Sequence, residues 1–208
     1  MAHAFDPRPV DTVLRALDIA ISGTVLVLLA PLWIAVAAIV LLSSGRPLLY
    51  RGARVGRFGY VFEMYKFRTL APDAEARLGP YLGAELSRRT AGELTAIGRP
   101  LRATHLDEVP QLWNVLRGDM SLVGPRPIRP PFFVELCEKV PQYWQRLVLR
   151  PGVTGFAQTR ITREETWEDK LSHDLEYIAD RSVSLYMRVL VTTAQRPFRR
   201  GAGTSAPE

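Results

Sequence analysis

A run of 24 residues without a charge, from Ile19 to Leu42, limits what this chain can fold into more than any other feature. As one straight helix the run would reach about 36 Å at 1.5 Å per residue, which exceeds the roughly 30 Å hydrocarbon core of a bilayer. A secretory signal is a poor fit, because Asp6 and Asp11 precede the run and no small-x-small cleavage pattern follows it. A buried core helix is the alternative, but fully apolar runs of this length are rare in soluble domains. We therefore expect this segment to enter a membrane.

Pro31 lies near the middle of the run and removes the hydrogen bond to the carbonyl of Val27. One outcome is a mildly kinked helix that still spans the bilayer. The other is a sharp break, after which each arm of about 17–18 Å dips part of the way and returns. Basic residues favour the break: Arg8 and Arg15 precede the run, and the segment from Ser43 to Leu70 carries six basic residues against Glu63 alone. Because basic flanks stay in the cytoplasm, a re-entrant hairpin would keep both ends of the run on that side.

The rest of the chain reads as globular. Apolar residues make up 47% and charged residues 23% of the sequence, which excludes a disordered or collagen-like chain. The single cysteine, Cys137, excludes a disulfide framework and a cysteine-rich zinc site. Period-2 patterns predict short strands at Leu48–Tyr50 and Val61–Phe67, and helical periodicity dominates elsewhere.

We therefore expect an α+β fold that is mostly helical. It would combine an N-terminal, proline-broken re-entrant membrane hairpin with a small cytoplasmic domain that has short strands and interfacial amphipathic helices. One such helix, Leu185 to Ala194, could equally be a core helix with a solvated basic tail. The expected division is residues 1–44 for the N-terminal segment and hairpin, 45–198 for the cytoplasmic domain and 199–208 for a disordered tail.

Two adjacent carboxylates, Asp107 and Glu108, stand just before Pro110. Proline is tolerated in the first turn of a helix, so we expect Asp107 to be the N-cap of a helix that ends at Gly118. The N-terminus of a helix favours ionised carboxylates and can bind phosphate. Mg²⁺ would supply the counter-charge through oxygen ligands. The alternative is that Asp107 only caps the helix and Glu108 only complements its dipole.

Arg126 stands between Pro125 and Pro127, shortly after the apolar pair Leu122-Val123. Pro127 disfavours α geometry at Arg126, and Pro125 has its own φ fixed. A rigid arginine beside a carboxylate pair is typical of a preorganised anion-binding site, which favours the functional interpretation of the dyad.

From about Val13 to Ala194 the sequence resembles the bacterial sugar transferases, that is, the monotopic polyprenyl-phosphate phosphoglycosyl transferases. Each matching piece is modest alone, but their number and order are specific. The pieces are Gly45-Arg46-Pro47 with Tyr50, the runs 65–69 and 97–102, the block Leu106 to Pro127, the run 151–158, and Trp167 with Lys170, Leu171, Asp174 and Tyr177.

The resemblance implies transfer of a sugar-1-phosphate from a UDP-sugar to undecaprenyl phosphate, with UMP as the second product. It implies that Asp107 is a nucleophile that carries a covalent sugar-phosphate and that Glu108 helps to bind Mg²⁺, so that the dyad serves both as catalytic pair and as metal ligands. Substrate phosphates would be held by a set of basic residues: Lys66, Arg68, Arg102, Arg126, Arg160 and Arg163.

Three departures from the family pattern stand out. Ala30-Pro31 replaces the Ser-Pro of many small members, so no hydroxyl is available for a carbonyl freed by the proline. Arg160 to Arg163 stands where many members have Asn-Gly-Arg, and either arginine could make the usual contact. Only about a dozen residues precede the predicted hairpin, which suggests the minimal catalytic form.

The expected setting is the bacterial inner membrane, with the catalytic domain on its cytoplasmic face, serving an early step of glycan assembly such as that of an exopolysaccharide. A net charge of +6 suits inner-membrane lipids and nucleotide substrates. A homodimer is compatible with the sequence, and a nucleic-acid partner is not expected because no basic arm with stacking aromatics is present. The other function class is an inactive membrane-anchored scaffold for glycan enzymes. The sequence leaves the sugar open.

Overall fold

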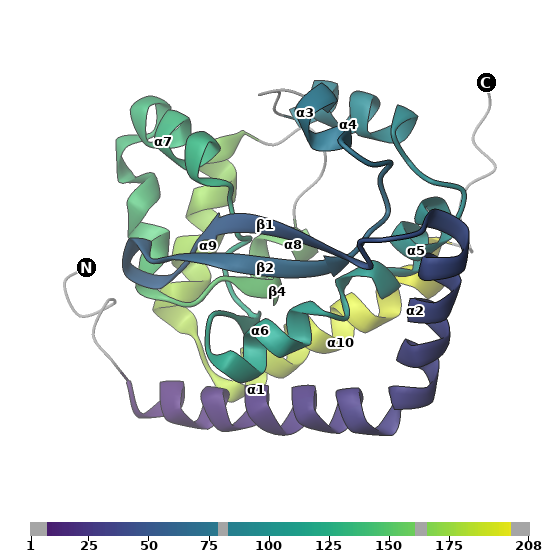
Figure 1. Cartoon of the computed structure of the whole chain (residues 1–208). Coiled ribbons are helices and arrows are strands. Elements are labelled where there is room, and N and C mark those ends of the chain that lie inside the picture. Colours follow the sequence, from purple (N-terminus) through teal and green to yellow (C-terminus); the bar gives the residue numbers. More distant parts are fainter. Residues whose placement is uncertain (1–7, 79–82, 161–165, 201–208) are drawn as a thin grey trace.

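The computed structural model describes residues 8–78, 83–160 and 166–200, and Figure 1 shows the whole chain as a ribbon. The α-helices are α1 (Pro9–Leu28), α2 (Ala30–Ser44), α3 (Ala74–Leu78), α4 (Gly83–Gly92), α5 (Gly98–Thr104), α6 (Gln111–Arg117), α7 (Pro130–Lys139), α8 (Phe156–Arg160), α9 (Trp167–Asp180) and α10 (Val183–Arg200). Three 3₁₀ segments are η2 (Arg57–Gly59), η3 (Leu106–Glu108) and η4 (Pro141–Val148). The strands are β1 (Leu49–Val55), β2 (Val61–Phe67), β3 (Ser121–Val123) and β4 (Gly152–Thr154).

The strands form two small two-stranded sheets. β1 and β2 pair antiparallel, from Leu49 opposite Phe67 to Val55 opposite Val61. β3 and β4 pair in parallel although about 30 residues separate them. The mostly helical α+β class and the strand at 61–67 are therefore confirmed. The first strand is longer than predicted, and nothing in its sequence marked β4 as a strand.

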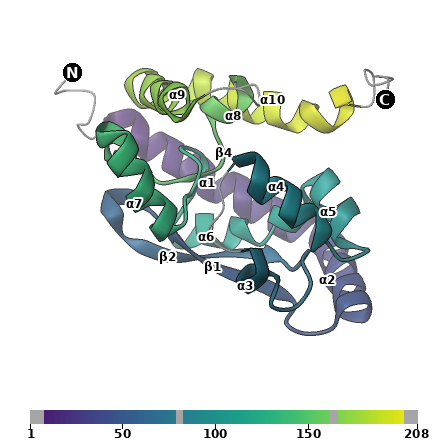
Figure 2. The ribbon, with the colours of Figure 1, turned by 90° about the horizontal axis from the view of Figure 1, so that it is seen from above.

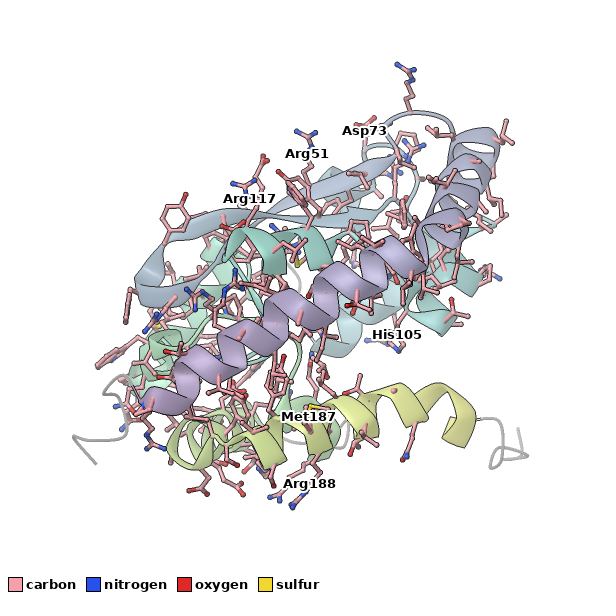
Figure 3. All side chains as sticks on the ribbon, turned by 90° about the horizontal axis from the view of Figure 1, so that it is seen from below. Arg51, Asp73, His105, Arg117, Met187 and Arg188 are labelled. Carbon is pink, nitrogen blue, oxygen red and sulfur yellow. The ribbon has the colours of Figure 1, made fainter. Side chains whose placement is uncertain are left out.

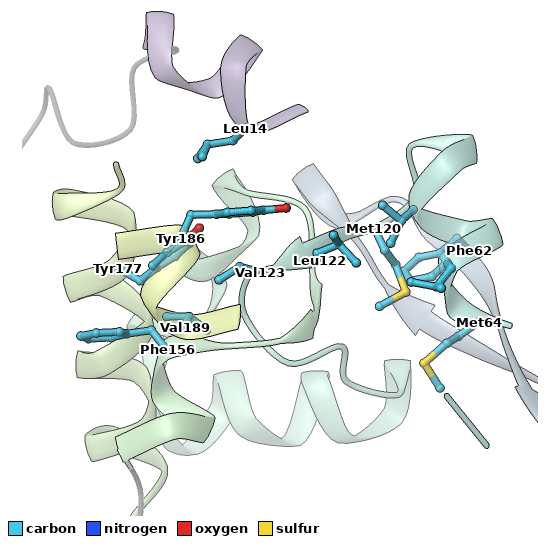
Figure 4. Packing of buried hydrophobic residues seen from close by; sticks show 12 residues of the cluster. Leu14, Phe62, Met64, Met120, Leu122, Val123, Phe156, Tyr177, Tyr186 and Val189 are labelled. Carbon is cyan, nitrogen blue, oxygen red and sulfur yellow. The ribbon is translucent and has the colours of Figure 1, made fainter. Parts of the chain in front are cut away.

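Two layers are visible when the molecule is turned (Figure 2). The β1–β2 ribbon lies on one side, and α8, α9 and α10 lie on the other. α1 runs along the lower face of the molecule (Figure 1). Figure 4 shows the core that joins these layers, where side chains from α1, β2, β3, α9 and α10 meet. The buried members include Leu14, Met64, Leu122, Tyr177 and Tyr186.

The apolar run is broken where the proline predicts. α1 ends at Leu28, α2 begins at Ala30 with Pro31 in its first turn, and the two helices are bent by 68°. Among the described residues no single helix is long and apolar enough to cross a membrane; the bent pair passes that test only when its two helices are taken together. The indole of Trp33 donates a hydrogen bond of 3.2 Å to the carbonyl of Val25, so a side chain beyond the proline binds the last turn of α1.

The surface around this break is apolar. Val27, near the end of α1, is 74% exposed, and Ile34, near the start of α2, is 69% exposed. Further along α2, Val36 and Val40 are buried against Phe67 and Leu101 of the globular part. The bend between α1 and α2 is therefore exposed, while both helices pack against the globular part of the protein further from the bend.

Polar side chains attach α1 to the globular part. Asp18 is buried and accepts hydrogen bonds from the Ser121 hydroxyl, the Leu122 amide and the Tyr186 hydroxyl, all within 2.9 Å. Arg15 donates to the carbonyls of Val115 and Leu116 at the end of α6. Figure 3 looks onto α1, with α10 running beside it. The division at residue 44 stays a prediction, but α1 shares its core with the residues that follow.

α10 contributes to that same core. Tyr186 and Val189 are buried, while Val183 and Val191 on other faces of the helix are exposed. The sequence of this helix allowed either a membrane-surface helix or a core helix with a solvated basic tail. Its buried face is that of a core helix. The predicted disordered tail falls almost entirely outside the described residues.

Candidate active site

The carboxylate dyad lies in a short 3₁₀ turn, not at the start of an α-helix. η3 holds Asp107 and Glu108, and α6 begins three residues later at Gln111 with Pro110 as its N-cap. The prediction that Asp107 caps the helix is therefore wrong. His105 takes a left-handed conformation at φ 58°, ends α5 and starts this tighter turn. The predicted C-cap is confirmed, because Gly118 ends α6 at φ 94°.

Asp107 is a buried carboxylate without a close partner. Its residue is 5% exposed, and it makes no hydrogen bond or ion pair with any residue the structure describes. Burial raises the pKa of its carboxyl, and the Glu108 charge adds to this, while Lys66, Arg102 and His105 act in the opposite direction. A carboxylate whose lone pairs are unused and whose basicity is raised is suited to act as a nucleophile or a metal ligand.

Glu108 is held differently from its neighbour. The ammonium of Lys66 lies 2.6 Å from its Oε1. Burial favours a higher pKa for this carboxyl, but Lys66 and then Arg126 outweigh burial, and the pKa of Glu108 lies below its ordinary value. The two carboxylates therefore have opposite pKa shifts: Glu108 stays ionised to lower pH than a free carboxyl, and Asp107 does not.

β2 and α5 bring the basic side chains to the dyad. Asn114 fixes β2 against α6, since its side chain accepts from the Tyr65 amide and donates to the Glu63 carbonyl. Lys66 follows on that strand. Arg102 comes from α5 and donates to the Thr69 hydroxyl at 3.0 Å. Burial lowers the pKa of Arg102, and the two carboxylates counteract it. The sequence did not predict that Asn114 would hold β2 or that Thr69 would bind Arg102. Both residues lie within the segments on which the family resemblance rests.

Arg126 is presented on a rigid loop. β3 leads into Gly124, where a Cβ would lie 2.4 Å from the carbonyl of Arg150, so only glycine allows this close approach. The Gly152 amide donates to the carbonyl of Pro125. The side chain of Arg126 is exposed and has no hydrogen-bond partner among the described residues. Its positive charge lowers the pKa of Glu108. It fits the predicted role of an anion-binding side chain.

Arg68 and Arg160 are not brought to the dyad in this way. Arg68 is buried, and its guanidinium donates to the carbonyls of Ser44, Gly45 and Arg46, so it secures the end of α2. Arg160 pairs with Glu176 of α9 at 3.0 Å and stacks on the ring of Phe156. Arg163 lies outside the described residues. The choice between Arg160 and Arg163 therefore stays open, and the role of Arg68 seen here is structural.

The dyad fits a magnesium ion by its donor set. Among the described residues no cluster of three or more His, Cys, Asp or Glu side chains can hold a metal ion. Mg²⁺, however, is commonly bound through one or two carboxylates together with substrate phosphates and water. The unused oxygens of Asp107 and the second oxygen of Glu108 are donors of that kind.

The sequence matches known proteins over most of its length. The family described as bacterial sugar transferase matches residues 10–200. A protein of Aeromonas hydrophila, described as a UDP-N-acetylgalactosamine-undecaprenyl-phosphate N-acetylgalactosaminephosphotransferase, is 34% identical over 85% of this chain, which spans 41% of that longer protein. The exopolysaccharide production protein PSS of Rhizobium leguminosarum bv. phaseoli is 37% identical over 91% of this chain and 96% of its own length.

A third relative, from Caulobacter vibrioides, is described as a UDP-glucose:undecaprenyl-phosphate glucose-1-phosphate transferase. It is 36% identical over 88% of this chain and 69% of its own length.

Proposed function

The chain belongs to the bacterial sugar transferase family, and we therefore propose that it is a phosphoglycosyl transferase that moves a sugar-1-phosphate from a UDP-sugar to undecaprenyl phosphate. The names of its relatives support this reaction class. The observation that carries the proposal in this chain is Asp107, a buried carboxylate with no hydrogen bond among the described residues, next to Lys66 and Arg102.

In the first step a carboxylate oxygen of Asp107 attacks the phosphorus atom that bears the sugar. The bond between that phosphorus and the bridging oxygen breaks, and UMP leaves with the electron pair. The enzyme then carries an aspartyl sugar-phosphate. The raised pKa of Asp107 makes its ionised form a better nucleophile, and no general base is needed because no proton has to be removed.

In the second step an oxygen of undecaprenyl phosphate attacks the same phosphorus. The bond to Asp107 breaks, the carboxylate is restored, and the product is an undecaprenyl-diphosphate sugar. Negative charge on the phosphoryl oxygens has to be stabilised in both steps. Lys66, Arg102 and Arg126 would supply positive charge there. We propose Mg²⁺ as the cofactor, held by Asp107 and Glu108, where it would neutralise further phosphate charge.

The acceptor is a lipid, which requires a membrane location. The exposed apolar bend between α1 and α2 supports a re-entrant insertion, since its arms return to the protein by way of Asp18 and Val40. We propose that the protein sits on the cytoplasmic face of the inner membrane. The sugar stays open, because relatives of similar identity are named for different sugars.

The test is UMP release by the purified full chain in detergent, with Mg²⁺, undecaprenyl phosphate and a panel of UDP-sugars. We expect release with one sugar, loss on chelation, and recovery with Mg²⁺. Asp107→Asn should reduce the rate by at least about 1,000-fold, because the attacking group is lost. Asp180→Asn, which removes an exposed carboxylate from the end of α9, is the matched control and should leave the rate unchanged.

The covalent intermediate is tested without acceptor. The intact mass of the protein should rise by one sugar-phosphate with wild type and Asp180→Asn, and should not rise with Asp107→Asn. Release that survives Asp107→Asn would rule out this nucleophile. A folded protein that releases no UMP with any donor would favour the inactive scaffold instead.

A further inference from the structure

A cavity of about 60 Å³ with charged and apolar lining residues lies against α1, away from the dyad. Its walls come from α1, η2, β3, α9 and the segment between η4 and β4. A single water molecule needs roughly 10–15 Å³ of such space, so the cavity has room for a larger group. Its charged lining residues are Asp11, Arg15, Asp18, Arg57, Arg150 and Arg181.

The charges of this lining do not balance. Asp11 pairs with Arg181 at 2.6 Å, and Asp18 accepts its three hydrogen bonds from Ser121, Leu122 and Tyr186. Four arginines thus face two carboxylates, and both carboxylates already have partners. Arg15, Arg57 and Arg150 are half-buried, and clustering partly desolvated cations without matching anions is unfavourable. An anion from outside the chain would balance this charge.

Arg57 and Arg150 leave donors unused. Each donates through its Nε to a backbone carbonyl, Arg57 to Val148 at 3.0 Å and Arg150 to Gly118 at 2.8 Å. Arg57 also lies over the ring of Phe58. Within the described ranges, the Nη groups of neither arginine have a hydrogen-bond partner. Burial and the charge of Arg150 lower the pKa of Arg57, as expected where two guanidinium groups face one space.

We propose that this cavity binds a phosphate group, as the dianion of a phosphate monoester or of inorganic phosphate, between the Nη groups of Arg57 and Arg150. Guanidinium groups match phosphate oxygens in a bidentate geometry, and a dianion would offset the surplus of two positive side chains in the lining. Arg15 adds positive charge from α1, although its own Nη groups are bound to backbone carbonyls.

This site is separate from the proposed transferase site. None of Lys66, Arg102, Asp107, Glu108 and Arg126 lines the cavity. Ser121 and Val123 of β3 do line it, and the loop that presents Arg126 begins directly after that strand. The phosphate could belong to a lipid, because α1 leads from this cavity to the apolar bend, or to a soluble compound. The chemistry of recognition is the same for both sources.

The experiment uses the full chain in phosphatidylcholine nanodiscs and measures the rate at which phenylglyoxal modifies individual arginines, by peptide mass spectrometry. One arm adds inorganic phosphate against chloride at equal ionic strength. The other replaces part of the phosphatidylcholine with phosphatidic acid. At ten times the dissociation constant, bound phosphate should slow modification of Arg57 and Arg150 by about tenfold. Arg188, which is exposed on α10, is the control and should be unaffected.

Protection by inorganic phosphate alone would identify a soluble ligand, and protection by phosphatidic acid alone would identify a lipid. Protection in both arms would show that the site recognises the phosphate group whatever its source. The same protection in Asp107→Asn would show that it does not depend on the transferase site. As a second measurement, calorimetric titration of inorganic phosphate should show one binding site fewer in Arg57→Gln/Arg150→Gln than in Arg188→Gln. No protection in either arm, or equal protection of Arg188, would overturn the proposal.

Discussion

Lys66 affects both carboxyl groups of the dyad. It pairs with Glu108 at 2.6 Å and also counteracts the rise in the pKa of Asp107. Without Lys66 both pKa values would rise, so more of each carboxyl would be protonated at a given acidic pH. We predict that Lys66→Met shifts the acidic limb of the pH profile of UMP release to higher pH, by about one unit or more.

Lys66→Arg keeps the charge and is the control for this shift. Rates are normalised to each variant's own maximum, since Lys66 is also a proposed phosphate ligand. An acidic limb at the same pH in Lys66→Met and wild type would show that this ammonium does not set the ionisation of the dyad.

Residue types were predicted better than residue contacts. Asp107, Glu108 and Arg126 lie in local patterns that have a chemical reason of their own, whereas Lys66 and Arg102 were implied by the family resemblance. In the structure the charges of these basic residues act on the dyad. Arg68 illustrates the limit. It stands two residues from Lys66 and has the same charge, yet it binds the carbonyls that end α2. Which group Arg68 binds depends on where α2 ends in space, and the residues around Arg68 do not predict that position.

At the scale of elements, a buried ion pair joins η4 to α9. Arg146 and Asp174 lie 2.7 Å apart, and their side chains are about 5% exposed or less. Removing one partner leaves the other charge buried and alone. We predict that Arg146→Met lowers the free energy of unfolding by about 3–5 kcal/mol, measured by denaturant titration.

An exposed pair provides the matched control for this prediction. Lys139 and Glu135 are 2.6 Å apart on the surface of α7, and Lys139→Met should change stability by less than about 1 kcal/mol. Replacing both buried partners, as in Arg146→Met/Asp174→Leu, should recover much of the loss. Equal effects of the buried and exposed single variants would contradict this account.

The bend between α1 and α2 makes a topological prediction. Thr12 and Ser43 are exposed and lie on the two arms of the broken helix. In a Cys137→Ala background we expect Thr12→Cys and Ser43→Cys to react with a membrane-impermeant maleimide only after the cells are permeabilised. If exactly one of the two reacts in intact cells, the segment spans the membrane.

Elements specified by their own residues were predicted, and elements specified by distant partners were not. Pro31 determines the break, and alternating residues determine β2. β4 has only three residues and exists because it pairs with β3. The dyad turn was assigned to the start of a helix because Pro110 is tolerated in a first turn. No pattern around His105 marks its left-handed conformation, which is uncommon for residues other than glycine.

At the scale of the whole molecule, α1 is both the start of the apolar run and a wall of the core. Arg15 and Asp18 form hydrogen bonds to residues 100 or more positions further along the chain. Leu14 belongs to the same core as Tyr177 and Tyr186. No sequence pattern marks such pairs. We predict that residues 45–208 expressed alone will not unfold cooperatively in thermal denaturation, whereas the full chain in detergent will. A cooperative transition in the shorter chain would confirm the division at residue 44 as a folding boundary.

The end of β2 connects two parts of the protein over a very short path. Lys66 of β2 binds the dyad, and Arg68, the first residue after the strand, binds the end of α2. Two residues of extended chain span about 7 Å. With α2 seated in a bilayer as proposed, the height of the dyad relative to the lipid headgroups is therefore set by the backbone and varies little. An acceptor would then be selected by the depth at which its phosphate rests, and the length of its isoprenoid tail would matter much less.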